Sequence, residues 1–297
     1  MIRMRIPATS ANIGAGFDSL GLAVSMYNYV NMDEHDGVCI RTLDSVTVPT
    51  DQSNLIYKTA KYLYDLCGRH CGGLYIEQEN NIPMARGLGS SSACIVAGLM
   101  GANRLMGDPL SRDEIINIAA ELEGHPDNST PALLGGQVTA VLDNKKVWYV
   151  KQEIRDDLRF VAIVPDFELK TSLARQALPR EINHKDGVFN LSRAALMSVS
   201  LYSGNYHNLR VAAQDRLHQP YRMELIKGAA AVMESSYLLD AYCAYISGAG
   251  STLMAIVSSE NTAFEGKMRS ILDSYGFAGW QLHTLKIDNQ GATLAQD

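Results

Sequence analysis

The feature that most constrains this chain is the segment Gly87-Leu-Gly89-Ser-Ser-Ser92, which runs directly into a long apolar stretch. Residues 93–106 are apolar on nearly every side of a helix, which predicts a helix buried in the middle of a domain. The first turn of such a helix presents unpaired N–H groups and a partial positive charge. Glycines let a backbone approach a ligand closely, and serine hydroxyls can bind phosphate oxygens or Mg²⁺. The segment therefore predicts a phosphate-binding loop; the alternative is an ordinary glycine turn capped by serines.

Two common nucleotide-binding motifs are excluded. No Gly-Lys-Ser/Thr follows the loop, so it is not a Walker A motif. The earlier pair Gly14-Ala-Gly16 is not a dinucleotide fingerprint, because the third glycine, Gly21, comes too late in the sequence.

Composition narrows the class of protein further. Of the 297 residues, 46% are hydrophobic, which excludes a disordered regulator. The net charge is −6 and no dense basic run occurs, so we expect no nucleic-acid partner. The longest apolar stretch, 93–102, is about half as long as a membrane span, so we expect no membrane partner either. An anionic ligand must then be held locally, by backbone amides and a few arginines.

The cysteines and the N-terminus predict a cytoplasmic protein. The five cysteines are an odd number and thinly spread, which is typical of free thiols in a reducing compartment. Pro7 and the polar residues after it interrupt any apolar export signal. Cys67, His70 and Cys71 supply three zinc ligands, but a closed zinc site needs four, so we expect no metal there.

The order of the expected elements favours an α+β fold of two domains over a doubly wound sheet, because strands and helices do not strictly alternate. Charged residues cluster near 150–157 and suggest a division into 1–155 and 156–297. Strands are expected near 2–9, 74–79, 138–142, 148–151, 160–164 and on both sides of a glycine turn at 247–251. Helices are expected near 53–67, 93–106, 111–123, 171–178, 187–215, 221–238 and 261–275.

A second group of chemically active residues is Glu121-Leu-Glu123-Gly-His125-Pro-Asp127-Asn128, where a helix ends in a turn. Mg²⁺ prefers oxygen ligands and commonly takes one or two carboxylates together with substrate phosphates. A carboxylate can also orient a hydroxyl nucleophile or accept its proton. The alternative is a plain helix end with a Gly-His-Pro turn. A third group, Ser247-Gly-Ala-Gly-Ser251, either lines the same pocket or is only a hairpin turn.

In this order the three motifs resemble those of the GHMP kinases, a superfamily that includes galactokinase, mevalonate kinase and homoserine kinase. Residues 83–93 resemble its ATP-binding signature and 247–251 its C-terminal glycine motif. The chain is most similar to the homoserine kinases, and the similarity runs from residue 4 to about 260. The segments that carry it are Pro7-Ala-Thr-Ser-Ala-Asn-Ile-Gly-Ala-Gly-Phe-Asp-Ser-Leu-Gly21, Glu123-Gly-His-Pro-Asp-Asn128, Pro131-Ala-Leu-Leu-Gly-Gly136 and Gln214-Asp-Arg-Leu-His-Gln-Pro-Tyr-Arg222.

The resemblance implies a two-domain GHMP kinase fold with the active site in a cleft between the domains. It implies transfer of the γ-phosphoryl group of Mg·ATP to the side-chain hydroxyl of L-homoserine, on the route to threonine, and it suggests a homodimer. Two other functions stay open: a GHMP kinase for a mevalonate-type acid or a sugar, and a nucleotide-sensing protein that has lost catalysis.

The resemblance also implies roles for individual residues. Ser91 and Glu123 would hold Mg²⁺, with Glu121 as a substitute for Glu123. Asn54 would touch the adenine, although a helix-capping role fits it equally well. The residues implied in ATP binding are Asn54, Pro83, Met84, Ala85, Arg86, Gly87, Leu88, Gly89, Ser90, Ser91, Ser92 and Ala93.

For homoserine, the family pattern falls on Asn12, Asp18, His125, Asn128, Arg175 and Arg222. An amino acid needs a carboxylate for its ammonium group, here Asp18, and guanidinium groups for its carboxylate, here the two arginines. Asp127 and Asn128 are the implied catalytic residues. Mevalonate kinases carry a lysine beside the catalytic aspartate, but the matching stretch here is Ala8-Thr9-Ser10. Asp127 is therefore either a general base or, as we expect, a group that orients the hydroxyl.

Overall fold

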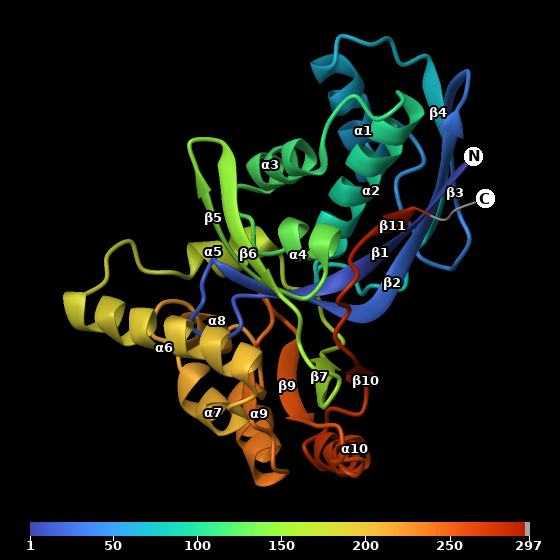
Figure 1. Cartoon of the computed structure of the whole chain (residues 1–297). Helices are drawn as coiled ribbons and strands as arrows, with labels where there is room; N and C mark the ends of the chain where they lie inside the picture. The colour runs from blue at the N-terminus through green and yellow to red at the C-terminus, as the bar shows by residue number, and fades with distance from the viewer. Residues whose placement is uncertain (295–297) are drawn as a thin grey trace.

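A sheet of seven strands forms the first layer of the protein, a computed structural model that describes residues 1–294. The strand order is β11-β1-β2-β4-β3, and β5 and β6 extend the sheet from β2 (Figure 1). Neighbouring strands are antiparallel except for the parallel pair β3 and β4. These strands are β1 (Ile2–Ala11), β2 (Leu20–Glu34), β3 (Gly37–Thr42), β4 (Gly73–Glu79), β5 (Gln137–Asp143), β6 (Lys146–Gln152) and β11 (Thr293–Leu294).

The central helix of this layer is α2 (Ser90–Leu105), which packs against β1 and against α1 (Leu55–Leu66), α3 (Arg112–Glu123) and α4 (Ser129–Leu134). Two glycines allow the close approach. A Cβ on Gly98 would lie 2.6 Å from the carbonyl oxygen of Ile56, and a Cβ on Gly101 would lie 2.6 Å from the sulfur of Met32. The expected buried helix at 93–106 is confirmed, and it begins one turn earlier than expected, at Ser90.

A second, antiparallel sheet has the strand order β10-β7-β9-β8. Its strands are β7 (Leu158–Val164), β8 (Cys243–Ile246), β9 (Leu253–Ser258) and β10 (Gln281–Leu285). The helices of this half are α5 (Thr171–Gln176), α6 (His184–Ser203), α7 (Leu209–Ala212), α8 (Gln219–Met223), α9 (Ala229–Leu238) and α10 (Phe264–Ser274). Mixed sheets and helices of this kind confirm the expected α+β class. No helix among the described residues is long and apolar enough to cross a membrane.

The chain crosses from the first sheet to the second between β6 and β7, near the expected boundary at 155/156. It then returns, because β11 pairs with β1 through Met4 and Leu294 and through Arg5 and Thr293. The division into 1–155 and 156–297 stays a prediction, and the described C-terminal strand belongs to the first sheet.

Several expected elements differ from the structure. The helix expected over 187–215 ends at Gly204, whose positive φ of 81° caps α6, and a short 3₁₀ turn and α7 follow. The helix expected over 221–238 is likewise divided, because Gly228 with a φ of 89° separates α8 from α9. The strands β2, β3, β10 and β11 and the short helix α4 were not expected from the sequence.

Candidate active site

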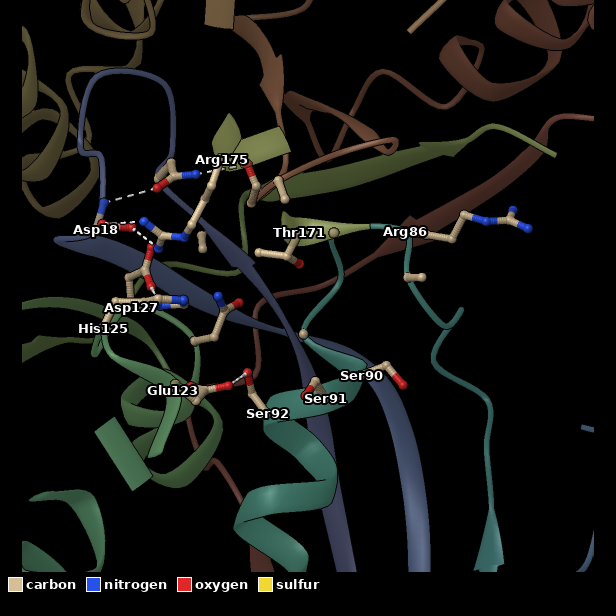
Figure 2. A pocket seen from close by; sticks show the side chains of 18 of the residues that line it. Asp18, Arg86, Ser90, Ser91, Ser92, Glu123, His125, Asp127, Thr171 and Arg175 are labelled. Atoms are coloured by element: carbon tan, nitrogen blue, oxygen red, sulfur yellow. Dashed lines mark hydrogen bonds and ion pairs between the residues drawn. The ribbon is translucent and has the colours of Figure 1, made fainter. Parts of the chain in front are cut away.

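A cavity of about 320 Å³ lies where segments of both sheets meet (Figure 2). The loop before α2 and the first turn of α2 line one part of it. The β1–β2 loop, the turn between α3 and α4, and residues of α5 and α8 line the other part. Gly248 and Ala249 of the β8–β9 loop also line it, so the third sequence motif is part of this pocket as well as a turn between two strands.

The glycines of the loop before α2 are required by space as well as by conformation. Gly89 has a φ of 71° at the N-cap of α2, and a Cβ there would lie 2.0 Å from Oγ1 of Thr9. A Cβ on Gly87 would lie 2.2 Å from the carbonyl oxygen of Ser247. Ser90, Ser91 and Ser92 follow on the cavity wall at the helix N-terminus. Backbone N–H groups and hydroxyls therefore face one hollow, a suitable cradle for phosphate.

Only part of the segment implied in ATP binding reaches this cavity. Ala85–Gly87 and Gly89–Ser92 line it, whereas Pro83, Met84, Leu88 and Ala93 do not. Leu88 and Ala93 are buried in the hydrophobic core instead. The guanidinium of Arg86 is turned toward the second sheet, where it donates to the carbonyl oxygens of Pro165 and Asp166. Arg86 thus ties the loop to the end of β7.

Asn54 lies away from the cavity and caps α1. Its Oδ1 accepts a hydrogen bond from the N–H of Ile56 at 2.9 Å, and its Nδ2 donates to the carbonyl oxygen of Pro49 at 2.9 Å. The capping role, which the sequence left open beside the adenine contact, is the one that the geometry displays. Contact with adenine stays a prediction.

The carboxylate of Glu123 is hydrogen-bonded to the first turn of α2. It accepts a hydrogen bond from the hydroxyl of Ser92 and another, at 3.1 Å, from the N–H of Ser129. Burial raises the pKa of Glu123, and the hydrogen bond from Ser92 opposes that shift. Glu121, the substitute that the sequence left open, is exposed and pairs with Lys145 at 3.0 Å. Glu123 and Ser91 both line the cavity, but the serine that contacts Glu123 is Ser92.

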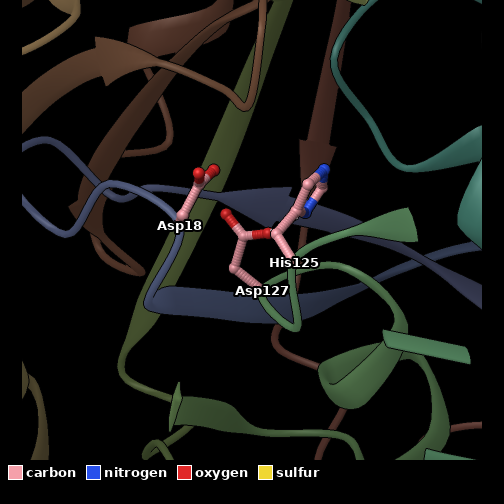
Figure 3. Close-up of side chains that lie close together, drawn as sticks. All are labelled: Asp18, His125 and Asp127. Carbon is pink, nitrogen blue, oxygen red and sulfur yellow. The ribbon is translucent and has the colours of Figure 1, made fainter. Parts of the chain in front are cut away.

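Asp18, His125 and Asp127 form a cluster in which one donor atom from each lies within 4.8 Å of the others (Figure 3). Nδ1 of His125 and Oδ1 of Asp127 are 2.6 Å apart, and Asp127 is only 2% exposed. Burial alone lowers the pKa of His125, but the hydrogen bond to Asp127 and the charges of Asp127, Glu123 and Asp18 together outweigh it, so the pKa is raised. The backbone here is tightly packed, because a Cβ on Gly21 of β2 would lie 1.8 Å from the carbonyl oxygen of Asp127.

Two arginines lie close to this acidic cluster. Arg175 forms a two-pronged ion pair with Asp18, with N–O distances of 2.9 and 3.1 Å. Arg222 is 2% exposed, and its Nη1 donates to the carbonyl oxygen of Gly248 at 2.8 Å. Burial lowers the pKa of Arg222 to about 10, so the group stays a cation at neutral pH. The pocket therefore presents both signs of charge within a small volume.

Asn12 connects the loop that carries Asp18 with the β8–β9 loop across this pocket. Its Oδ1 accepts from the N–H of Asp18 at 3.0 Å, and its Nδ2 donates to the carbonyl oxygen of Gly248 at 2.8 Å. Asn128 faces the glycine loop, where its Oδ1 accepts from Oγ1 of Thr9 at 2.8 Å. The residues implied by the family pattern for an amino-acid substrate are thus brought together, since all six line the one cavity.

Comparisons with known proteins agree with this arrangement. The family described as GHMP kinases N terminal domain matches residues 54–136. Homoserine kinase of Clostridium beijerinckii is 45% identical over 100% of this chain and 99% of its own length. The chain belongs to the homoserine kinase family. Homoserine kinase of Caldicellulosiruptor bescii is 44% identical, with 99% of this chain and 97% of its own length covered. The crystal structure of homoserine kinase from Cytophaga hutchinsonii matches with a TM-score of 0.87 and 28% identity, covering 99% of this chain and 97% of that one.

Some residues at or beside this cavity were missed from the sequence. Thr9 and Phe17 lie in the segment 7–21 that the sequence analysis singled out, and Thr171 at the start of an expected helix, but none of the three was assigned a role. Phe17 lies with its ring centroid 5.7 Å from the guanidinium of Arg175 and 5.2 Å from that of Arg222, a contact between a ring face and two cations. Thr171 opens α5 on the cavity wall, one turn before Arg175. The signal for Phe17 was available, because it directly precedes Asp18 in a segment already singled out.

Proposed function

We propose that this protein transfers the γ-phosphoryl group of ATP to the side-chain hydroxyl of L-homoserine and so produces O-phospho-L-homoserine for threonine biosynthesis. The proposal rests on the observation that the two parts of the candidate site belong to a single cavity. A phosphate cradle at the start of α2 and a pocket with two carboxylates and two arginines share its walls. An α-amino acid carries an ammonium and a carboxylate on one carbon, and the pocket supplies a partner for each.

The nucleotide end of the cavity fits a triphosphate and Mg²⁺. Gly87 and Gly89 leave the space that a Cβ would fill, so the triphosphate can lie against the backbone. Hydroxyl oxygens of Ser91 and Ser92 and the carboxylate of Glu123 are hard oxygen donors of the kind that Mg²⁺ prefers. When bound, Mg²⁺ would neutralise charge on the phosphate oxygens. Ser91 and Glu123 are the residues that we propose as its protein ligands.

At the acceptor end, Asp18 would bind the ammonium group, and Arg175 and Arg222 would bind the carboxylate. Asp18 and Arg175 pair with each other in the structure. The bound substrate would replace this ion pair, with its ammonium group beside Asp18 and its carboxylate beside Arg175. The hydroxyl is then directed toward Asp127 and Asn128, at the side nearest to the glycine loop. Phosphoryl transfer through a loose transition state depends mainly on positioning and charge stabilisation.

The decisive experiment compares acceptors with purified protein. ADP release is measured with ATP, Mg²⁺ and, in turn, L-homoserine, mevalonate and galactose, and phosphorus NMR identifies the product. Of the three acceptors, we expect only homoserine to be phosphorylated. Turnover of mevalonate or galactose without homoserine would assign another GHMP kinase activity, and nucleotide binding with no turnover would favour a sensing protein.

Asp127 is proposed to orient the hydroxyl rather than to remove its proton. One oxygen of its carboxylate already accepts from His125, and no lysine occupies the facing stretch of β1, where Thr9 contacts Asn128 instead. Changing Asp127 to Asn keeps the shape and one acceptor oxygen, so we expect kcat to fall by less than about tenfold. Loss of a general base would cost roughly 10²–10⁴ in kcat. The measurement is kcat at saturating substrates, with circular dichroism to confirm folding; a loss of a thousandfold or more would restore the base role.

Glu123 and Glu121 provide a matched pair of variants for the magnesium proposal. The change Glu123→Gln removes a charge from the cavity wall, and we expect the Mg²⁺ concentration for half-maximal activity to rise about tenfold, since one charge-assisted contact is lost. The change Glu121→Gln removes the same charge from an exposed side chain that pairs with Lys145. We expect that variant to behave as wild type. An equal response of both variants would contradict the assignment of Glu123.

We also propose that the protein works in the cytoplasm and as a homodimer. All five cysteines are free, which supports a reducing compartment. Sedimentation of the purified protein at micromolar concentration tests the dimer, and a monomer under those conditions would refute it.

A further inference from the structure

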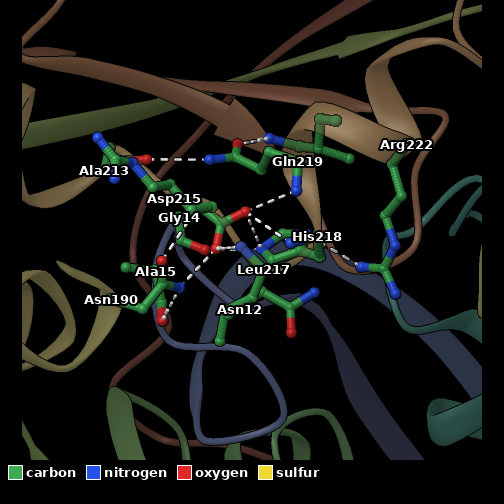
Figure 4. Close-up of polar contacts among 12 residues, drawn as sticks. Asn12, Gly14, Ala15, Asn190, Ala213, Asp215, Leu217, His218, Gln219 and Arg222 are labelled. Carbon is green, nitrogen blue, oxygen red and sulfur yellow. Dashed lines mark hydrogen bonds and ion pairs between the residues drawn. The ribbon is translucent and has the colours of Figure 1, made fainter. Parts of the chain in front are cut away.

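A buried polar network lies beneath the acceptor pocket, and Asp215 is at its centre (Figure 4). The side chain of Asp215 is fully buried. It accepts hydrogen bonds from Nδ2 of Asn190 at 2.6 Å and from the backbone N–H groups of Leu217, His218 and Gln219 at 3.0, 2.9 and 2.6 Å. These bonds hold the turn that leads into α8, the helix that carries Arg222.

His218 connects this turn to the pocket. Its imidazole is fully buried, with Nε2 2.7 Å from the carbonyl oxygen of Gly14 and Nδ1 3.2 Å from Nη1 of Arg222. A carbonyl oxygen can only accept, and a guanidinium can only donate. The ring must therefore donate through Nε2 and accept through Nδ1, which defines the neutral Nε2–H tautomer. Burial and the nearby charge of Arg222 lower the pKa of His218, while the charge of Asp215 opposes that shift.

The two hydrogen-bond partners of His218 lie on different segments beside the acceptor pocket. Gly14 lies in the β1–β2 loop that carries Phe17 and Asp18, and a Cβ on Gly14 would lie 2.6 Å from the backbone of Ala213. The Phe17 ring is stacked on the imidazole, with centroids 5.3 Å apart and an angle of 28° between the planes. One side chain thus contacts the loop of the ammonium-binding carboxylate and also the buried arginine for the carboxylate.

We propose that His218 is a positioning residue that sets the separation between Asp18 and Arg222, and that it thereby selects acceptors with an ammonium and a carboxylate on one carbon. This inference rests on the proposed homoserine kinase function. His218 does not line the cavity itself and acts only through the residues that it contacts. A merely structural histidine would affect stability, or both substrates alike, and would not act selectively on the amino-acid substrate.

Two conservative variants separate the two hydrogen bonds of the ring. In His218→Gln the amide N–H₂ can still donate to Gly14, but the acceptor for Arg222 is lost. In His218→Asn the amide oxygen can still accept from Arg222, but the donor to Gly14 is lost. For both variants we expect the KM for homoserine to rise about tenfold, the KM for ATP to change by less than about twofold, and kcat to change little. His207→Asn, in an exposed position, is the matched control.

A double-mutant cycle tests the route of each effect. Because the Gln variant acts through Arg222, we expect it to add nothing to the homoserine KM in an Arg222→Ala background. The Asn variant acts through the Gly14 loop, so we expect it to add nothing in an Asp18→Asn background. Full additivity in both backgrounds would overturn the proposal, as would unchanged homoserine KM in the folded variants or an equal rise in the ATP KM.

A measurement on the wild-type protein covers the case in which the variants do not fold. Nitrogen NMR of the imidazole groups reports tautomer and charge, and we expect the His218 ring to be neutral with its proton on Nε2 at pH 7. Its Nδ1 resonance should shift when homoserine is added and stay unchanged with ATP alone. A proton on Nδ1, or no response to homoserine, would refute the proposal. A wild type that does not phosphorylate homoserine would refute the proposed function instead, and the two failures are thus distinguished.

Discussion

Changing Gly89 to valine is expected to reduce kcat/KM for ATP by at least about a thousandfold and to abolish detectable nucleotide binding. Gly89 has a φ of 71°, which a β-branched residue adopts only with strain. A Cβ there would also lie 2.0 Å from Oγ1 of Thr9 and 3.3 Å from Oδ1 of Asn128. Relief of these contacts must displace the loop or the strand that faces it, so the phosphate cradle cannot keep its shape.

Gly107, just after the other end of α2, provides the matched control. It has a comparable φ of 84°, but a Cβ there would meet nothing within 4 Å. Gly107→Val therefore introduces the same backbone strain without closing the cradle, and we expect a small loss of stability with nearly normal ATP binding. Calorimetric titration with a non-hydrolysable ATP analogue, together with thermal unfolding, provides both readouts. Unchanged ATP affinity in Gly89→Val would contradict the phosphate-binding assignment.

Removal of either acceptor-pocket arginine is expected to raise the KM for homoserine by roughly 10- to 100-fold, since a charge-assisted pair contributes about 1.5–3 kcal/mol. The KM for ATP should change little in both Arg175→Ala and Arg222→Ala. The two variants are expected to differ in folding stability. Arg175 is partly exposed and its ion pair with Asp18 adds little to folding, whereas Arg222 is buried and bonded to Gly248. We therefore expect a lower melting temperature only for Arg222→Ala.

Arg216 is the matched control for this pair. It precedes the same helix α8 but is half exposed, and its guanidinium pairs with Asp186 at 2.8 Å outside the cavity. We expect Arg216→Ala to leave both KM values unchanged. If the ATP KM alone rises in the Arg175 and Arg222 variants, the arginines serve the nucleotide and the orientation of substrate in the pocket must be reversed.

Elements with a local signal were predictable. Ser111 and Glu114 form the capping box that the sequence indicated, and α3 begins directly after Ser111. The hairpin of β5 and β6 turns at Asn144 and Lys145, both with positive φ, where polar turn residues had indicated it. In each case the residues that determine the conformation are neighbours in the sequence, so pattern alone is sufficient.

Elements that depend on distant partners were not predictable. The strand β2 pairs with β1, β4 and β5 along different parts of its length, and no single alternation describes a strand with three sets of neighbours. The strand β11 has two residues and exists because β1 offers an edge to it. Strand pairing joins residues that are far apart in the chain, and the sequence of either strand by itself does not indicate its partner.

The candidate site divides in the same way. Its family motifs determined, from the sequence alone, that a phosphate loop, acidic residues and arginines would share a pocket. Tertiary structure decided which member of each motif faces it: Glu123 lines the cavity and Glu121 does not, Ser92 rather than Ser91 contacts that carboxylate, and Asn54 caps a helix elsewhere. Helix ends and loops project successive side chains in different directions, and only the packing around them selects one. Asp215 and His218 show this most clearly, because polar residues in a turn before a short helix are typical of a surface, whereas here they are buried and support the pocket from beneath the Gly14 loop.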